Sequence, residues 1–216
     1  MNNFLISDIK IDELNAMVEK IMEQTGIKDP KKAVKMMNSG ELKVESKWIE
    51  KDGVIHFSVT SDGTTGKEWI TRLKRKGFRL DDYAESILRS KDFKPTNGII
   101  YKIAILNGGL ISRYDDYITT ETILKEGARR KLYGPNAEIA CLIREKFSDE
   151  EMLSMDLPYS IVVMHEPIKD PDGSPRLLHT DRFLNPSWLG VYHGNHDGRW
   201  DRNHGFAFVV SQVSNS

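Results

Sequence analysis

From Asp170 to Ser216 the chain contains no lysine and no glutamate, although the preceding 169 residues contain 19 Lys and 15 Glu. Met, Ile and Cys are absent there as well, whereas four of the six histidines and two of the four tryptophans lie in this segment. So sharp a change in composition limits which secondary structure this segment can form. We expect short strands and loops in it, after the longer helices that precede it. We interpret this segment as the functional surface and the rest of the chain as its support.

The densest part of this segment, residues 179–204, is rich in His, Asn, Asp, Gly and Arg. Short amides, imidazoles and carboxylates supply hydrogen-bond donors and acceptors at a low cost in side-chain entropy, whereas Lys and Glu lose more rotamer freedom when they are immobilised. Together with anchoring tryptophans, this composition is typical of an antibody-like binding surface rather than of an ordinary solvated face. The sequence therefore predicts a recognition surface at 179–204.

The same residues share a pattern at the level of codons. An asparagine codon of the AAC or AAT type, changed at its adenines, never yields Lys, Glu, Gln, Met or Trp. Between His179 and His204, every residue except Trp188 and Trp200 belongs to the set that such a codon can yield. Ile and Cys also belong to that set and are nevertheless absent, which this pattern does not explain.

In these features the chain resembles the variable proteins of diversity-generating retroelements, in which an error-prone reverse transcriptase rewrites adenine positions near the 3′ end of a gene. That family has a C-terminal variable region with fixed Trp and Gly residues and a closing aromatic β-strand of the Gly-Phe-Arg type, on a C-type-lectin-like fold. Trp188, Trp200 and Gly205-Phe206 match those positions here, and Ala207 departs from the arginine of better-known members. The resemblance covers about the last quarter of the chain.

This resemblance implies a ligand-binding display protein, often with a protein ligand, whose fold is α+β with a helical N-terminal part and a C-type-lectin-like C-terminal part. Trp188, Trp200, Gly205 and Phe206 would be scaffold anchors for a variable surface at 179–204. Oligomerisation would add avidity, and we expect neither catalysis nor a cofactor or bound metal. The residues expected to contact the ligand are His179, Asp181, Phe183, Leu184, Asn185, Tyr192, His193, Asn195, His196, Asp197, Asp201, Asn203 and His204.

The composition of the whole chain is that of an ordinary globular protein, with 39% hydrophobic residues, 29% charged residues and a formal net charge of −1. This balance argues against a dedicated nucleic-acid or anionic-membrane binder. The single Cys141 excludes an intramolecular disulfide and suits a reducing compartment. No stretch approaches the roughly 18 apolar residues of a membrane span, and the N-terminus lacks a signal-peptide pattern. We therefore expect a cytoplasmic protein without a membrane span.

Hydrophobic periodicity, capping residues and turn residues predict the order of the elements. Helices are expected at about 8–25, 30–38, 66–76, 81–90, 120–131, 135–147 and 149–155. Strands are expected at 54–60, 98–106, 159–164 and 205–210, with surface loops over 176–204. The chain divides into a helical N-terminal extension at 1–50 and an α+β domain at 51–216.

A metal-dependent enzyme is the first alternative function. Imidazole and carboxylate side chains together suit zinc or a similar ion, and five candidates lie within a glycine-containing loop near the C-terminus. A diversified surface would contain the same residue types, so the sequence does not decide between the two readings. The candidate ligands are His193, His196, Asp197, Asp201 and His204.

A nucleic-acid binder through the basic helix at 69–76 is the second alternative, since this helix carries Arg72, Lys74, Arg75 and Lys76 beside a tryptophan. The acidic start of the following helix would face phosphates badly, so a solvated basic face is the simpler interpretation.

Two shorter motifs receive structural interpretations. Gly63-Thr-Thr-Gly-Lys67 lacks the spacing of a phosphate-binding P-loop, and Thr65 with Glu68 forms a helix capping box instead. His165-Glu166 is expected at a strand end, where adjacent side chains point to opposite faces. We therefore interpret this pair as a core-edge histidine beside a surface glutamate.

Overall fold

The computed structural model describes residues 18–19, 22, 25–39, 47–112, 117–154, 160–182 and 188–214. The chain divides into two compact units, Met1–Lys47 and Trp48–Ser216. In the first unit, helix α2 spans Pro30–Asn38, as predicted. Of the helix predicted at 8–25, Val18, Glu19, Met22 and Thr25 are helical, and the rest lies outside the described residues.

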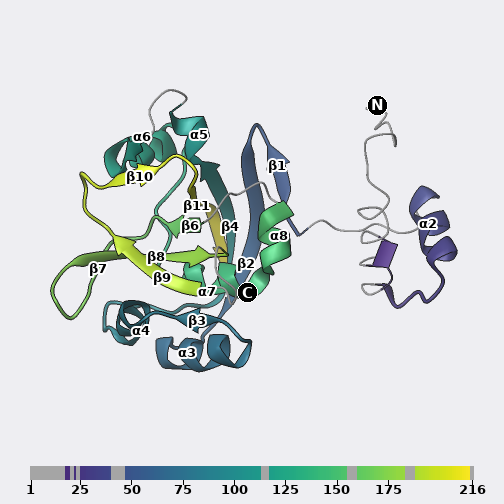
Figure 1. Cartoon of the computed structure of the whole chain (residues 1–216), viewed down its shortest axis with the longest axis horizontal. Coiled ribbons are helices and arrows are strands. Elements are labelled where there is room, and N and C mark those ends of the chain that lie inside the picture. The colour runs from purple at the N-terminus through teal and green to yellow at the C-terminus, as the bar shows by residue number, and fades with distance from the viewer. Residues whose placement is uncertain are drawn as a thin grey trace. The chain divides into compact units, whose positions relative to one another are not determined.

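The second unit is a mixed α+β domain built around one large sheet (Figure 1). Its strands are β1 (Ile49–Lys51), β2 (Val54–Asp62), β3 (Arg79–Leu80), β4 (Asn97–Asn107), β5 (Tyr117–Thr119), β6 (Ser160–Val163), β7 (Ile168–Lys169), β8 (Pro175–Asp181), β9 (Trp188–His193), β10 (Arg199–Asp201) and β11 (Gly205–Ser214). Its helices are α3 (Gly66–Arg75), α4 (Asp82–Arg89), α5 (Gly108–Ile111), α6 (Thr120–Arg129), α7 (Glu138–Lys146) and α8 (Asp149–Ser154). The predicted α+β class is therefore confirmed.

Among the described residues, nine strands form the main sheet, in the order β1-β2-β4-β11-β6-β8-β9-β3 with β7 paired to β8. Neighbouring strands are antiparallel except in the pairs β11–β6 and β9–β3, which are parallel. Strand β11 lies between β4 and β6, so the closing strand predicted from the sequence is central to the sheet. Strands β5 and β10 form a separate antiparallel ribbon.

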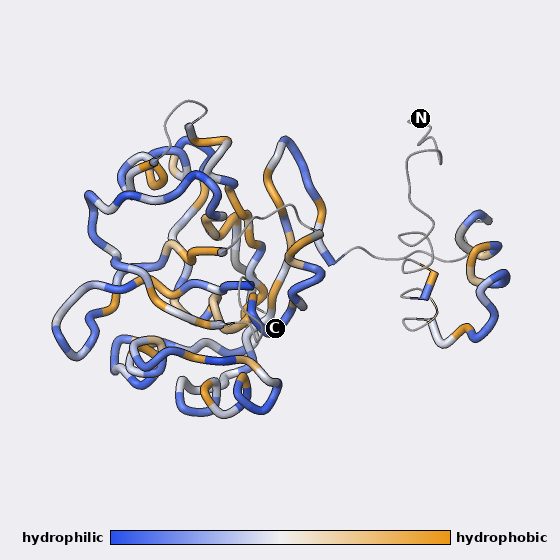
Figure 2. The backbone as a smooth tube through the Cα atoms, viewed as in Figure 1, coloured by the Kyte–Doolittle hydropathy of each residue, from blue (hydrophilic) through white to orange (hydrophobic). Residues whose placement is uncertain are grey.

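The two faces of the sheet pack against different elements. One hydrophobic layer joins the sheet to α3, α4 and α7 and includes Trp69 and Ile103. The other joins the sheet to α6 and to the β5–β10 ribbon and includes Ile123, Trp200 and Phe206. Figure 2 shows apolar residues gathered in the interior of this unit and hydrophilic residues along the segment that contains β10.

The expectation of surface loops over 176–204 is wrong, because three strands, β8, β9 and β10, lie there. Strand β8 was missed because both of its faces are covered, so that His179 and Thr180 are buried polar residues and the apolar–polar alternation is lost. Strand β9 was missed because Gly190 interrupts the apolar pattern of its sequence. A side chain at Gly190 would approach Nε2 of His179 to 2.6 Å, so this position requires glycine.

Candidate functional site

The residues expected to contact a ligand differ in how far their side chains are exposed to solvent. Asp181, Tyr192 and His204 are half-buried, and His179 is only 7% exposed. Phe183, Leu184 and Asn185 lie outside the described residues. The exposed ones are His193, Asn195, His196, Asp197, Asp201 and Asn203. These six lie between the end of β9 and the start of β11, and we call residues 193–203 the recognition segment.

Trp200 attaches the recognition segment to the body of the unit. Its side chain is 4% exposed and lies in the layer beneath α6, whereas its neighbours in β10, Arg199 and Asp201, are exposed. Opposite orientations of successive side chains are a property of any strand. The Trp200 ring meets Tyr192 edge-on, with 5.6 Å between centroids, and Phe206 at 5.9 Å. Trp200 therefore lies where a scaffold anchor was expected.

Thr120, the first residue of α6, holds the same segment by three hydrogen bonds. Its hydroxyl accepts Nε1–H of Trp200 at 2.8 Å and donates to the carbonyl oxygen of Asn195 at 2.9 Å. Its backbone N–H donates to the carbonyl of Gly198 at 3.0 Å. The N–H of Gly198 in turn donates to the carbonyl of Asn195, which closes a tight turn. The turn from Asn195 to Gly198 is thus positioned by Thr120 rather than by the exposed side chains of the segment. Asp201 is an exception among the six, because its carboxylate accepts the backbone N–H of Asn203 at 2.8 Å.

The other expected anchors have different environments. Gly205 and Phe206 are buried where β11 enters the sheet between β4 and β6. Ala207 is fully buried in the layer that contains α7, so an arginine at this position would place a charge in the core. Trp188 is half-buried, and the guanidinium of Arg79 lies 5.7 Å from its ring centroid.

His179 is a packing residue. The Ser160 hydroxyl lies 2.9 Å from its Nδ1, and its ring stacks on Tyr192 with 4.0 Å between centroids. Burial, followed by the proximity of His204, lowers the pKa of His179 from 6.5 to about 3. A role in ligand contact, expected from the sequence, does not fit a neutral ring held inside the sheet layer.

His165 is buried in a comparable way. Its Nε2 accepts the backbone N–H of Leu178 at 3.0 Å, so Nδ1 carries the proton and donates to the carbonyl of Glu166 at 2.6 Å. Burial lowers the pKa of His165 to about 4. The side chain of Glu166 is exposed, so the interpretation of a core histidine beside a surface glutamate is confirmed, although both residues follow β6 rather than lie in it.

The candidate metal ligands do not converge. In the part of the chain that the structure describes, no three His, Cys, Asp or Glu side chains are close enough to hold a metal ion. Nη1 of Arg176 lies 3.0 Å from Nε2 of His193, and this cation disfavours a second one at the same ring. His204 lies against the rings of Tyr192 and Trp200. The arrangement gives the metal-dependent alternative no support.

The basic helix offered as a nucleic-acid binder is α3, and three of its four candidate cations, Arg72, Lys74 and Lys76, are paired. Nε of Arg72 lies 2.6 Å from Oε1 of Glu145, and Lys76 pairs with the same carboxylate at 2.7 Å. Lys74 pairs with Glu85. These carboxylates neutralise most of the positive charge of the basic residues. The exposed surface of α3 is therefore a solvated surface with ion pairs rather than a cationic surface available to phosphates.

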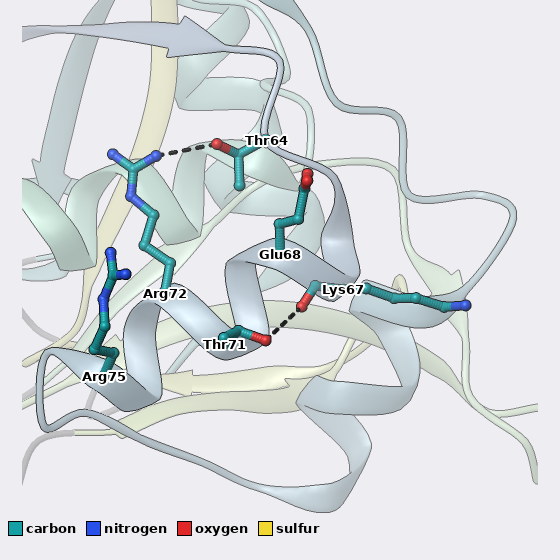
Figure 3. Close-up of a pocket in the computed structure, with 6 residues that line it drawn as sticks. All are labelled: Thr64, Lys67, Glu68, Thr71, Arg72 and Arg75. Carbon is teal, nitrogen blue, oxygen red and sulfur yellow. Dashed lines mark hydrogen bonds between the residues drawn. The ribbon is translucent and has the colours of Figure 1, made fainter.

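The segment 63–67 caps α3 and does not wrap a phosphate. The hydroxyl of Thr65 accepts the N–H of Glu68, and the Glu68 carboxylate accepts the N–H of Thr65 at 2.8 Å, which confirms the predicted capping box. The adjoining hollow has a volume of about 430 Å³. Figure 3 shows Glu68 in its lining together with Arg72 and Arg75, and Lys67 pointing away. Arg72 is already paired with Asp62 and Glu145, and the spacing of residues 63–67 remains that of a helix cap.

Comparison of the chain with family models, with curated proteins and with solved structures gives no match. Among its described helices, none is long and apolar enough to cross a membrane.

Sequence reasoning missed Thr120, the residue that holds the recognition segment. Thr120 follows the helix-capping residue Thr119 and is indistinguishable in sequence from an ordinary first-turn threonine. Its partners Asn195 and Trp200 lie 75 and 80 residues away, and no local pattern connects them.

Replacing Thr120 by valine is expected to lower the free energy of unfolding by about 2 kcal/mol, because the buried N–H of Trp200 loses its partner and the carbonyl of Asn195 keeps only the N–H of Gly198. The change is measured by urea unfolding. Thr120→Ser keeps the hydroxyl and should restore most of the loss, whereas Thr122→Val, at an exposed position of the same turn, should cost less than about 0.5 kcal/mol. Equal losses for Thr120→Val and Thr122→Val would contradict the role of Thr120.

The two buried histidines make stability depend on pH. Their folded-state pKa values, about 4 for His165 and about 3 for His179, lie below the unfolded value near 6.5. Their contribution is therefore complete above about pH 6.5 and is lost as the pH falls towards those folded-state values. We expect roughly 2 kcal/mol per histidine to be lost between pH 7 and pH 5. NMR should show both imidazoles still neutral at pH 5, and protonated rings in the folded protein would overturn this expectation.

Proposed function

We propose that the chain is a binding protein that recognises a macromolecular ligand, a protein, through the recognition segment. One observation carries this proposal: the six exposed predicted contacts lie on a short segment whose backbone is held by the buried Trp200 and by Thr120. Apart from Asp201, whose carboxylate accepts the N–H of Asn203, the expected contact residues are therefore different from the residues that hold the segment. Such a surface can change its side chains without losing its frame.

The frame also favours affinity. Loops that are already ordered lose little conformational entropy when they bind, and His, Asn and Asp add hydrogen bonds at a low side-chain cost. The half-buried rings of Tyr192 and His204 lie directly beneath the segment, with 5.5 Å between their centroids. Aromatic groups at the centre of a polar rim are the common arrangement of binding hot spots.

We further propose that this C-terminal part is the variable region of a diversity-generating retroelement protein on a C-type-lectin-like frame. The support is the codon-compatible composition of 179–204, the burial of Trp200 between exposed neighbours, and the burial of Gly205 and Phe206 at the start of β11. A cytoplasmic location, and an oligomer that would add avidity, stay predictions.

We propose binding rather than catalysis because Ser160 and His179, a hydroxyl and an imidazole that could act together in a reaction, are buried in the packed interior. The hydroxyl of Ser160 and the imidazole of His179 lie 2.9 Å apart, but the two residues are only 1% and 7% exposed. Burial also lowers the pKa of His179 to about 3, so this imidazole would be a weak general base near neutral pH.

The proposal is tested by randomising the six exposed contacts at once with the codon set of an adenine-altered asparagine codon, and displaying the library on yeast. We expect most members to fold, since none of the six side chains is buried, and selection against a panel of purified proteins to yield specific binders. Folding is scored by resistance to protease and binding by sorting.

The matched control is a library of equal size at six exposed positions of the helical side of the unit. Binders should arise from the recognition segment far more often than from the control. The proposal fails if the recognition library is mostly unfolded, or if both libraries yield binders at the same frequency. The control positions are Lys67, Thr71, Arg75, Lys91, Asp92 and Lys94.

A further inference from the structure

A pocket of about 680 Å³ lies beside the second half of β11, away from the recognition segment. Its walls include Tyr101 from β4, Val209 and Val210 from β11, and Tyr133 and Pro135 from the connection between α6 and α7. Tyr101 and Val209 belong to the layer that packs against α7, on the opposite face of the sheet from Trp200. Val210 packs against the layer of Trp200, but among the described residues that line the pocket none belongs to the recognition segment.

The backbone around this pocket is held in place from both sides. Strand β11 changes its register with β4 between Val209 and Ser211, and such a bulge bends a strand and redirects the side chain that it leaves unmatched. On the other edge, Tyr133 and Val209 exchange two main-chain hydrogen bonds, of 2.8 and 2.9 Å. The rim that carries Tyr133 is thus fixed by main-chain bonds that do not involve its ring.

A chain of hydrogen bonds also fixes the floor of the pocket. The Thr96 hydroxyl donates to Oε2 of Glu138 at 2.8 Å, so it must accept from the Tyr101 hydroxyl, 2.9 Å away. The Tyr101 hydroxyl in turn accepts Nδ2–H of Asn136 at 3.2 Å. Tyr101 is 4% exposed and its polar atom is engaged twice, so its ring is a preformed wall.

The remaining wall is an aromatic ring that folding does not bury. Tyr133 is 65% exposed, although its main chain is ordered. An exposed large aromatic beside a hollow is a frequent sign of a binding site. Among the described residues, none that lines this pocket carries a charge, so an ionic ligand would lose its water without gaining a counter-charge.

We propose that this pocket binds an uncharged aromatic small molecule, which packs against the exposed ring of Tyr133. The volume is within the range of about 300–1,000 Å³ that small-molecule sites occupy. Ser211, which also lines the pocket, supplies a hydroxyl group that would orient the ligand.

Indole is the probe, and indole-3-carboxylate, the same ring with a negative charge, is its counterpart. Titration of the full chain with indole should shift the backbone NMR signals of Tyr133, Asn136 and Val210 saturably, while the carboxylate binds at least about tenfold more weakly. Tyr133→Ala should weaken indole binding by about fivefold, as expected for the loss of one aromatic contact. Its melting temperature should stay unchanged, because the ring is exposed and the bridge to Val209 is made by main-chain atoms.

Tyr117→Ala is the matched control, since Tyr117 is 62% exposed and lies on the β5–β10 ribbon. It should leave indole binding unchanged. The proposal is overturned if millimolar indole does not move the three signals, if the carboxylate binds as tightly as indole, or if the two tyrosine variants lose binding equally. None of these outcomes bears on the recognition segment, which is tested separately.

Discussion

The hydroxyl group of Thr120 is the contact on which the proposed recognition surface depends. It accepts the indole N–H of Trp200 and donates to the carbonyl of Asn195, so one side chain from α6 joins a buried ring to an exposed turn. Hydrogen bonds inside the protein contribute modestly when made, but a buried group left without a partner is costly. The segment therefore keeps its shape through buried groups, and its exposed side chains remain available for binding.

Local signals predicted the helical parts of the fold well. Thr65 and Glu68 form their capping box, Asp81 caps α4, and Pro30 begins α2, because capping and proline geometry act within one turn of the chain. Helix α7 begins at Glu138, three residues after the predicted start. Strands β4 and β11 were predicted equally well from their long apolar runs, since central strands of a sheet are apolar on both faces.

Contacts between residues that lie far apart in the sequence could not be predicted from the sequence. His179 looked like a surface residue because polar residues are usually exposed, yet pairing of β8 with β6 and β9 buries it between Ser160 and Tyr192. Trp200 was assigned correctly to the interior, since a large ring among small polar residues has few other roles. The contact of Trp200 with Thr120 could not be predicted, because no local sequence pattern connects a hydroxyl group on a helix with a residue 80 positions later.

The central claim is that contact and support are divided between neighbouring residues of one segment. The most direct test is deep sequencing of the 3′ end of this gene, with its flanking DNA, in the source population. We predict substitutions at adenine positions in the codons of the six exposed contacts, with Trp200, Gly205 and Phe206 unchanged and a near-copy template nearby. A sequence that is invariant throughout 193–203, or one that varies as freely at Trp200 as at His196, would contradict this account.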